Sequence, residues 1–371
     1  MPAGFPIDHW NLRPAARVTT LPHDARFPEC HVKYPFRPLA AVPLMLLFGG
    51  CLNNGIADDK AAADAMAAEH LTTQPWHLAG TDTPGLAIFS DHYKICTTIR
   101  DPLYQHLLAR VLEAAYARSQ VLNAGTPVTP PGGVFECYVF GDRPQWELYT
   151  RLRMGPNAAT YLQISAGGYA QQGVFAGYDI SRDRTLSVIA HEAWHQYAYF
   201  AFKDRIPAWL DEGIATQNEH IDIDPTTGAV LGFSPEKNYA RYQAVMAAMR
   251  EQRLWKLPDL MATHAGKVVG MSQKYVDAYY GQLWALVLFM EHSDEYRPRL
   301  IAALKAAREG KLSAALAATV RPEEMAAASE RWNAAAGGYM GALIEPDMAR
   351  LEGKYRAFLE EISGGWPLKI R

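Results

Sequence analysis

The sequence predicts an α+β fold, in which a small mixed β-sheet precedes a mainly helical region. Short segments rich in β-branched and aromatic residues lie between residues 85 and 182, a pattern typical of strands. From Asp183 onward the apolar residues recur at helical spacing and alanine is frequent. We therefore divide the 371 residues into an upstream extension with a signal (1–51), a tether (52–84), an α/β subdomain (85–182), a helical region that carries the chemical motifs described below (183–295) and a C-terminal helical region (296–371).

The individual elements are expected in this order along the chain. The tether is rich in Ala, Asp, Gly and Thr, with a short helix over 57–70. Asp101 and Pro102 predict the start of an amphipathic helix that runs to about residue 121. Strands are expected over 86–90, 93–98, 134–140 and 173–179. Further helices are expected near 145–153 and over 184–202, 207–219, 235–250, 275–292 and, in Ala-rich pieces, 299–362.

An apolar run of twelve residues, 39–50, precedes Cys51. It is too short to span a bilayer but suits the core of a signal peptide, with Lys33 and Arg37 as its positive flank. The segment 47–51 resembles a bacterial lipoprotein cleavage site, although Phe48 stands where a smaller residue is common. The resemblance implies a lipid anchor at Cys51 and a place at the bacterial cell envelope rather than in the cytoplasm. The alternative is a buried apolar segment of the fold.

Composition excludes some classes of partner. A formal net charge of −3, without a clustered run of Lys and Arg, gives no reason to expect a nucleic-acid partner. Two cysteines, Cys96 and Cys137, lie in expected strands. In an oxidising compartment they could form a disulfide, and otherwise they are two small buried side chains in neighbouring strands.

The segment His191-Glu192-Ala193-Trp194-His195 carries the clearest chemistry. Two histidines four residues apart project from one face of a helix, which is the spacing of two nitrogen ligands on a zinc ion. Glu192 lies between them and could act as general base on a water at the open metal position.

A second segment, Pro207 to Thr216, offers a carboxylate as third ligand. Glu212 comes seventeen residues after His195, and Pro207 suits the first turn of a helix. Asp211 and Glu219 are rivals for this role; on a helix Asp211 would point about 100° away from Glu212. Glu219 lies two turns beyond Glu212 on nearly the same face. It could therefore hydrogen-bond a ligand histidine, or it could be a solvated surface charge.

The two segments together resemble the zinc metallopeptidases whose third ligand is a glutamate, the gluzincins, and especially the bacterial peptidase-MA-like group. The resemblance implies a zincin-like fold and selects Glu212, which precedes Gly-x-Ala, as third ligand. It also implies that the strand over 173–179 forms the sheet edge along which an extended peptide lies. A tyrosine that opens a later helix stabilises the oxyanion in related aminopeptidases; Tyr280 is the better match and Tyr279 the second, with a packed ring as the alternative.

These features predict a zinc-dependent metallopeptidase with one Zn²⁺ per chain and a peptide or protein substrate. Related aminopeptidases carry a Gly-x-Met-Glu-Asn segment that holds the free amine, and residues 166–170 ahead of the expected edge strand contain no such motif. An endopeptidase is therefore favoured. Two alternatives remain: an envelope lipoprotein that binds a partner and keeps a structural or vestigial zinc site, and a zinc amidase that acts on cell-wall peptides.

Overall fold

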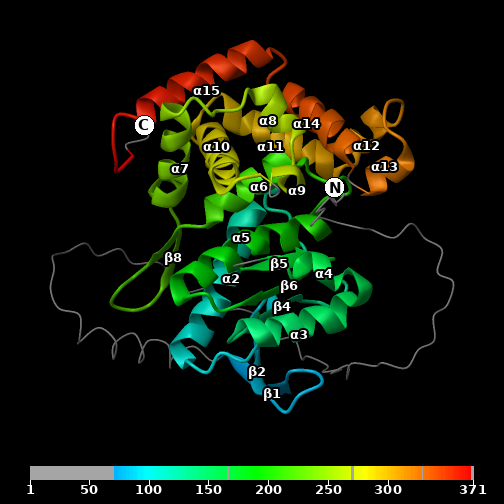
Figure 1. The fold of residues 1–371 in the computed structure, drawn as a ribbon, viewed down its shortest axis with the longest axis vertical. Coiled ribbons are helices and arrows are strands. Elements are labelled where there is room, and N and C mark those ends of the chain that lie inside the picture. The colour runs from blue at the N-terminus through cyan, green and yellow to red at the C-terminus, as the bar shows by residue number, and fades with distance from the viewer. Residues whose placement is uncertain (1–70, 165–166, 269–270, 328, 369–371) are drawn as a thin grey trace.

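The α+β prediction is confirmed by a computed structural model, which describes residues 71–164, 167–268, 271–327 and 329–368. A sheet with its helices forms one half of the molecule, and a larger group of helices forms the other (Figure 1). The signal run, Cys51 and the helix expected over 57–70 lie outside the described residues. None of the described helices is long and apolar enough to cross a membrane.

The sheet has six strands in the order β1-β2-β3-β4-β6-β5. It is mixed: β3 is parallel to β4 and β4 to β6, while the pairs β1/β2, β2/β3 and β5/β6 are antiparallel. The strands are β1 (Thr72–His77), β2 (Pro84–Phe89), β3 (Tyr93–Thr97), β4 (Phe135–Phe140), β5 (Gly168–Gln171) and β6 (Val174–Tyr178). A separate two-stranded sheet pairs β7 (Ile221–Ile223) with β8 (Val230–Phe233).

Two details of the sheet differ from expectation. Thr72–His77 forms β1, so the predicted tether through residue 84 is wrong over this part. The strand expected over 173–179 exists as β6, but it is not the edge strand, because β5 pairs with it on its outer side. The edge next to the metal-bearing helix is therefore β5.

The two cysteines are buried and no disulfide joins them. In the parallel register Cys96 lies beside Tyr138, and Cys137 lies beside Ile95. Because side chains alternate between the faces of a strand, the two thiols point to opposite faces of the sheet. The disulfide is therefore wrong, and the alternative of two buried side chains in neighbouring strands is confirmed.

Both faces of the sheet are covered. On one face Cys137, Val139 and Phe175 join the main core, to which α2 (Pro102–Leu122) and α5 (Arg182–Ala201) also contribute. Asp101 caps α2 by accepting the Leu103 amide at 2.9 Å, as its position before Pro102 predicts. On the other face an aromatic cluster lies under α3 (Arg143–Met154) and α4 (Ala158–Tyr161); its buried members are Leu78, Phe140, Trp146, Tyr149, Tyr161, Tyr169, Ala176 and Tyr178.

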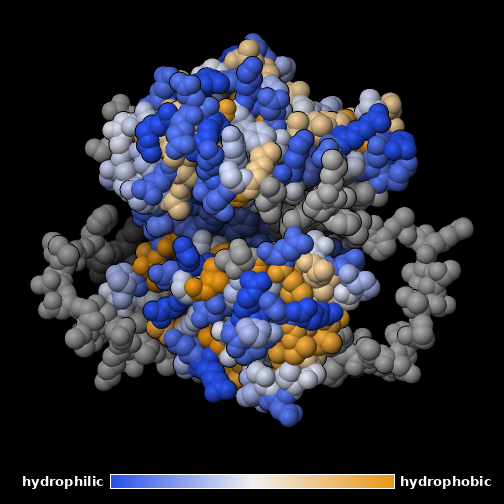
Figure 2. Space-filling view, viewed as in Figure 1, coloured by the Kyte–Doolittle hydropathy of each residue, from blue (hydrophilic) through white to orange (hydrophobic). Residues whose placement is uncertain are grey.

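The helical half begins with α6 (Ala208–Ala215) and has α10 (Gln273–His292) at its centre. The remaining helices are α7 (Tyr239–Arg250), α8 (Leu257–Ala262), α9 (Ala265–Val268), α11 (Tyr296–Arg308), α12 (Lys311–Leu316), α13 (Pro322–Ala327), α14 (Glu330–Ile344) and α15 (Met348–Ile362). The longer helices agree with those expected from the sequence to within a few residues, whereas the short helices α4, α8 and α9 and the β7–β8 hairpin were not foreseen. Figure 2 shows a hollow between the two halves, at the level where Figure 1 has α5 and α6.

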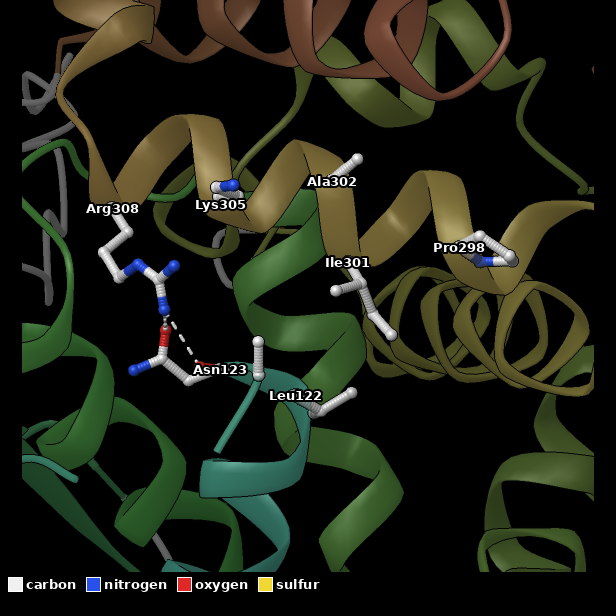
Figure 3. A pocket seen from close by; sticks show the side chains of 8 residues that line it. Leu122, Asn123, Pro298, Ile301, Ala302, Lys305 and Arg308 are labelled. Atoms are coloured by element: carbon white, nitrogen blue, oxygen red, sulfur yellow. Dashed lines mark hydrogen bonds between the residues drawn. The ribbon is translucent and has the colours of Figure 1, made fainter. Parts of the chain in front are cut away.

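Hydrogen bonds connect the two halves where α2 ends. Arg308 of α11 donates hydrogen bonds to the Asn123 backbone oxygen at 3.0 Å and to its side-chain oxygen at 3.1 Å (Figure 3). It also donates to Thr126 Oγ1 at 2.8 Å. Beside it is a cavity of about 240 Å³, lined mainly by apolar side chains such as Leu122 and Ile301. None of the residues lining this cavity belongs to the candidate site, so it is separate from the metal chemistry.

Candidate metal centre

Helix α5 presents both histidines of the first segment on one side, as their spacing predicts. The ring centroids of His191 and His195 are 5.1 Å apart. The surrounding residues Ile189, Ala190, Ala193 and Trp194 are buried, so this part of α5 crosses the core. The exposed fraction of the side chain is 13% for His191 and 1% for His195, which leaves His191 on the more open side of the site.

Helix α6 brings Glu212 to the two imidazoles. Its Oε2 atom lies 3.4 Å from His191 Nε2 and 3.8 Å from His195 Nε2. The ligand atoms of the three residues all lie within 4.8 Å of one another. Tetrahedral ligands held at about 2.0–2.1 Å from a zinc ion are roughly 3.3 Å apart. The three side chains therefore fit a common metal ion with little adjustment.

The position of Glu212 depends on the close packing of α6 against α10. A Cβ atom added at Gly213 would lie 2.6 Å from Val287 Cγ2 and 3.2 Å from the Leu283 backbone oxygen. Only glycine allows this approach without a shift of one helix. The glycine that follows Glu212 thus fixes the distance at which α6 holds its carboxylate.

Glu192 lies beside the two histidines and is itself buried. Within the part of the chain that the structure describes, its Oε2 atom has no hydrogen-bond partner. Burial raises the pKa of Glu192 to about 7, although the charges of His195 and His191 and the backbone amide of Ala170 oppose that rise. A carboxylate that titrates near neutrality is suited to general base catalysis. Ala170 belongs to β5, so the edge strand runs next to this group.

Each histidine is oriented from behind by a carboxylate. His191 Nδ1 is 3.0 Å from Glu219 Oε1, which confirms the expected hydrogen bond of Glu219 to a ligand histidine. His195 Nδ1 lies 3.2 Å from Asp211 Oδ1, and the same oxygen accepts the Trp194 indole N–H at 2.7 Å. Such partners fix the ring orientation and the tautomer of a ligating histidine.

The role of Asp211 was not foreseen, because the sequence presented it only as a rival ligand. Its offset of about 100° from Glu212 was the available signal, since it turns Asp211 away from the ligand position. Two further polar partners also escaped the sequence analysis. Glu219 Oε2 accepts hydrogen bonds from Asn238 Nδ2 at 2.9 Å and Arg241 Nε at 2.7 Å. Both residues come from a later segment of the chain, which no local pattern connects to the histidines.

The electrostatic balance of the site favours a cation. Four carboxylates and one guanidinium surround the histidines: Glu192, Asp211, Glu212, Glu219 and Arg241. Burial by itself would lower the pKa of His191, but the carboxylates of Glu212 and Glu219 outweigh it and raise that pKa to about 10. Burial would also lower the pKa of His195. The carboxylates of Asp211 and Glu212 outweigh this effect, so the pKa of His195 is raised as well. The excess of negative charge favours the protonated form of both histidines, and a bound divalent ion would offset that charge instead.

The structure separates the two candidate tyrosines. Tyr279 is buried and its hydroxyl donates to the Thr263 backbone oxygen at 3.5 Å, so it is a packed ring. Tyr280 is only partly buried, and burial together with the charges of Glu212 and Glu192 raises its pKa well above the ordinary value. The charge of Glu212 also raises the pKa of Tyr279, so the two tyrosines differ in exposure and in the hydroxyl bond of Tyr279, and these differences leave Tyr280 as the better candidate.

Comparison with known proteins covers this part of the chain. Residues 185–311 match a family described as "Protein of unknown function (DUF1570)". No curated protein matches the chain. The matched segment extends from α5 to the end of α11, and it includes both histidines, Glu212, Glu219 and Tyr280. The segment that carries the candidate metal centre is thus similar to this family.

Proposed function

We propose that the protein is a zinc-dependent metallopeptidase of the gluzincin type. The proposal depends chiefly on one observation: His191, His195 and Glu212 hold their ligand atoms within 4.8 Å of one another, with Glu192 beside them. Two imidazole nitrogens and one carboxylate oxygen are the donors of many catalytic zinc sites, in which the fourth position stays open. A structural site would have four protein ligands and no need of an adjacent buried carboxylate.

The chain's own groups have distinct tasks in this chemistry. Zinc, when bound, would supply the Lewis acidity that activates water near neutral pH and polarises a carbonyl. Glu192 would take the proton of the attacking water and return it to the leaving amine. Asp211 and Glu219 would keep the Nε2 atoms of the histidines directed at the ion. Tyr280 would donate a hydrogen bond from its hydroxyl group to the developing oxyanion.

The proposed substrate is an extended peptide that lies along β5. This strand pairs with β6 on one side, and among the described residues no strand pairs with its other side. A free strand edge can bind an extended peptide through main-chain hydrogen bonds. Because Ala170 of β5 contacts Glu192, a peptide bound there would pass close to the general base. Since the segment leading into β5 has no group to hold a free amine, we favour an endopeptidase.

Replacing Glu192 by Gln tests the proposed base. The amide keeps the size of the side chain but cannot accept the proton, so zinc content should stay near that of the parent protein. Cleavage of unfolded proteins and peptides should fall by at least about 10²-fold, the lower range for loss of a general base. A matched control is Glu251→Gln, which changes an exposed carboxylate beyond the end of α7.

Full cleavage activity in the Glu192→Gln variant would remove this residue as the base. Cell-wall fragments belong in the same substrate panel. Their selective cleavage would favour the amidase alternative. Zinc binding without hydrolysis of any of these substrates would favour the binding lipoprotein.

A further inference from the structure

Arg241 of α7 is a partly buried cation that the proposed chemistry does not use. Its guanidinium forms two parallel hydrogen bonds with Glu219: Nε to Oε2 at 2.7 Å and Nη2 to Oε1 at 2.6 Å. The same Oε1 atom also lies 3.0 Å from His191 Nδ1. A paired arrangement of this kind fixes the plane of the carboxylate, which a lysine could not do. Arg241 therefore sets the orientation of the group that orients His191.

The same guanidinium also contacts the candidate oxyanion donor. Its central carbon lies 5.0 Å from the centroid of the Tyr280 ring, within the range of a cation–π interaction. Tyr280 projects from α10, a different helix from those that carry the ligands. One side chain thus contacts both the outer partner of a metal ligand and the ring of the tyrosine.

Gly281 brings the two helices close enough for this contact. A Cβ atom added there would lie 2.9 Å from the Val245 backbone nitrogen and 3.2 Å from the Arg241 backbone oxygen. Helices α7 and α10 therefore pack backbone to backbone one residue away from Tyr280. Asn238 caps the start of α7 by accepting the Arg241 amide at 3.3 Å, and it also donates to Glu219 at 2.9 Å. The first turn of α7 therefore contacts the site through Asn238 and Arg241, and it packs against α10 at Gly281.

We propose that Arg241 is a positioning residue that couples the metal ligand His191 to Tyr280, so that metal affinity and turnover both depend on one guanidinium. Through Glu219 it holds the imidazole in the orientation that directs Nε2 at the ion. Through its flat face it holds the Tyr280 ring against α7. The Tyr280 part of this inference rests on the proposed peptidase function, whereas the part that concerns metal affinity does not.

The first test measures the affinity for Zn²⁺ by competition with a chelator. Loss of a partner behind a ligating histidine typically weakens metal binding by about 10–100-fold, and we expect a loss in this range for Arg241→Met. Arg241→Lys restores the charge without the paired hydrogen bonds, so its affinity should lie between those of Arg241→Met and the parent protein.

The matched control is Arg253→Met. Arg253 also joins α7 to α10, because it follows α7, donates to the Lys274 backbone oxygen at 2.7 Å and lies over the Tyr275 ring at 5.9 Å. It contacts no residue of the metal centre, so its replacement should leave zinc affinity unchanged. Melting curves of the metal-free proteins show whether each variant is folded. The absorption spectrum of bound Co²⁺ should change in Arg241→Met and not in the control.

A double variant tests whether Arg241 acts through Glu219. Glu219→Gln alone should weaken zinc binding to a similar extent, and Glu219→Gln with Arg241→Met should be little worse than either single change, because both interrupt the same path. Additive losses would contradict this path. Unchanged zinc affinity in both Arg241→Met and Arg241→Lys would overturn the inference while leaving the zinc site intact.

The second test concerns turnover of a cleaved peptide. Tyr280→Phe should lower kcat and leave zinc affinity unchanged. At saturating zinc, Arg241→Met should lower kcat more than it raises KM, and it should add little further loss to Tyr280→Phe. An equal further loss in both backgrounds would overturn the coupling to Tyr280. If the parent protein binds zinc but cleaves no peptide, the proposed function fails and the zinc measurements still decide the role of Arg241.

Discussion

Glu192 shows how the surroundings of one residue determine its chemistry. The carboxyl group is buried beside two histidines, and burial raises its pKa to about 7. A base must be ionised, so activity is lost as the pH falls through this pKa. A bound cation would favour the carboxylate and move the acid limb to lower pH.

We therefore expect kcat/KM to fall with decreasing pH with an apparent pKa at or below about 7, the value set by burial in the metal-free site. The measurement is a pH–rate profile at saturating zinc. Tyr280→Phe should leave the acid limb nearly unchanged, because it does not remove the base. An acid limb well above pH 7 would contradict the assignment of Glu192 as the base, because a bound cation can only lower its pKa.

The raised pKa of His191 leads to a prediction about proton release on zinc binding. Its pKa of about 10 in the metal-free site means that it is protonated at pH 7, whereas a metal ligand must be neutral. Zinc binding at pH 7 should therefore release at least one proton. Calorimetric titrations in two buffers with different ionisation enthalpies measure this number, and identical heats in both buffers would contradict it.

The same shift has a consequence for the metal-free protein. The folded pKa lies above the reference value of 6.5, so the ionised His191 stabilises the fold fully below about that pH. This contribution is lost as the pH rises toward about 10, the folded value. Zinc replaces the proton as the positive charge among the carboxylates.

At the scale of elements, three helices meet at the site because glycines allow close packing. Gly213 lets α6 approach α10, and Gly281 lets α7 approach the same helix. The ligand Glu212, its neighbour Asp211 and the positioning residue Arg241 are carried on the helices that these contacts fix. Small changes in helix position would thus reach the metal ligands directly.

Gly213→Ala should therefore weaken both the fold and the site. The added methyl group would meet Val287 Cγ2 at 2.6 Å, and overpacking of this kind costs about 1–3 kcal/mol. Zinc affinity should fall as well, because α6 must shift. The control is Gly353→Ala in α15, where an added Cβ meets nothing within 4 Å and the helix should gain up to about 1 kcal/mol. Denaturant unfolding measures both, and equal stability of the two variants would contradict the packing argument.

The elements also show what the sequence could predict. The ligand helix was predictable because metal chemistry imposes a fixed spacing on two histidines of one helix. Glu212 was chosen over Asp211 and Glu219 only through the resemblance to the gluzincins. Asp101 and Pro102 likewise marked the start of α2 through local capping. The edge strand β5 was missed because Gly168–Gln171 is too short to show a strand pattern. Arg241 was missed because its pairing with Glu219 joins segments that only the packing of α7 on α10 brings together.

At the scale of the whole molecule, the candidate site lies where the two halves meet. The sheet contributes the edge strand β5 and the contact of Ala170 with Glu192. The helical half contributes Glu212, Arg241 and Tyr280. Helix α5 belongs to the core of both, so its histidines stand at the junction. A substrate in the hollow between the halves would contact both of them (Figure 2).

The central claim is that this junction holds one zinc ion on His191, His195 and Glu212. The most direct test is the amount of zinc bound per chain in the purified protein, compared with His195→Ala and with His220→Ala. His220 is a partly exposed histidine whose contact is Asp222 at 3.8 Å, outside the ligand set. We expect about one zinc per chain in the parent protein and in His220→Ala, and its loss in His195→Ala. A parent protein that binds no zinc under non-chelating conditions, even after the metal is added back, would contradict the account.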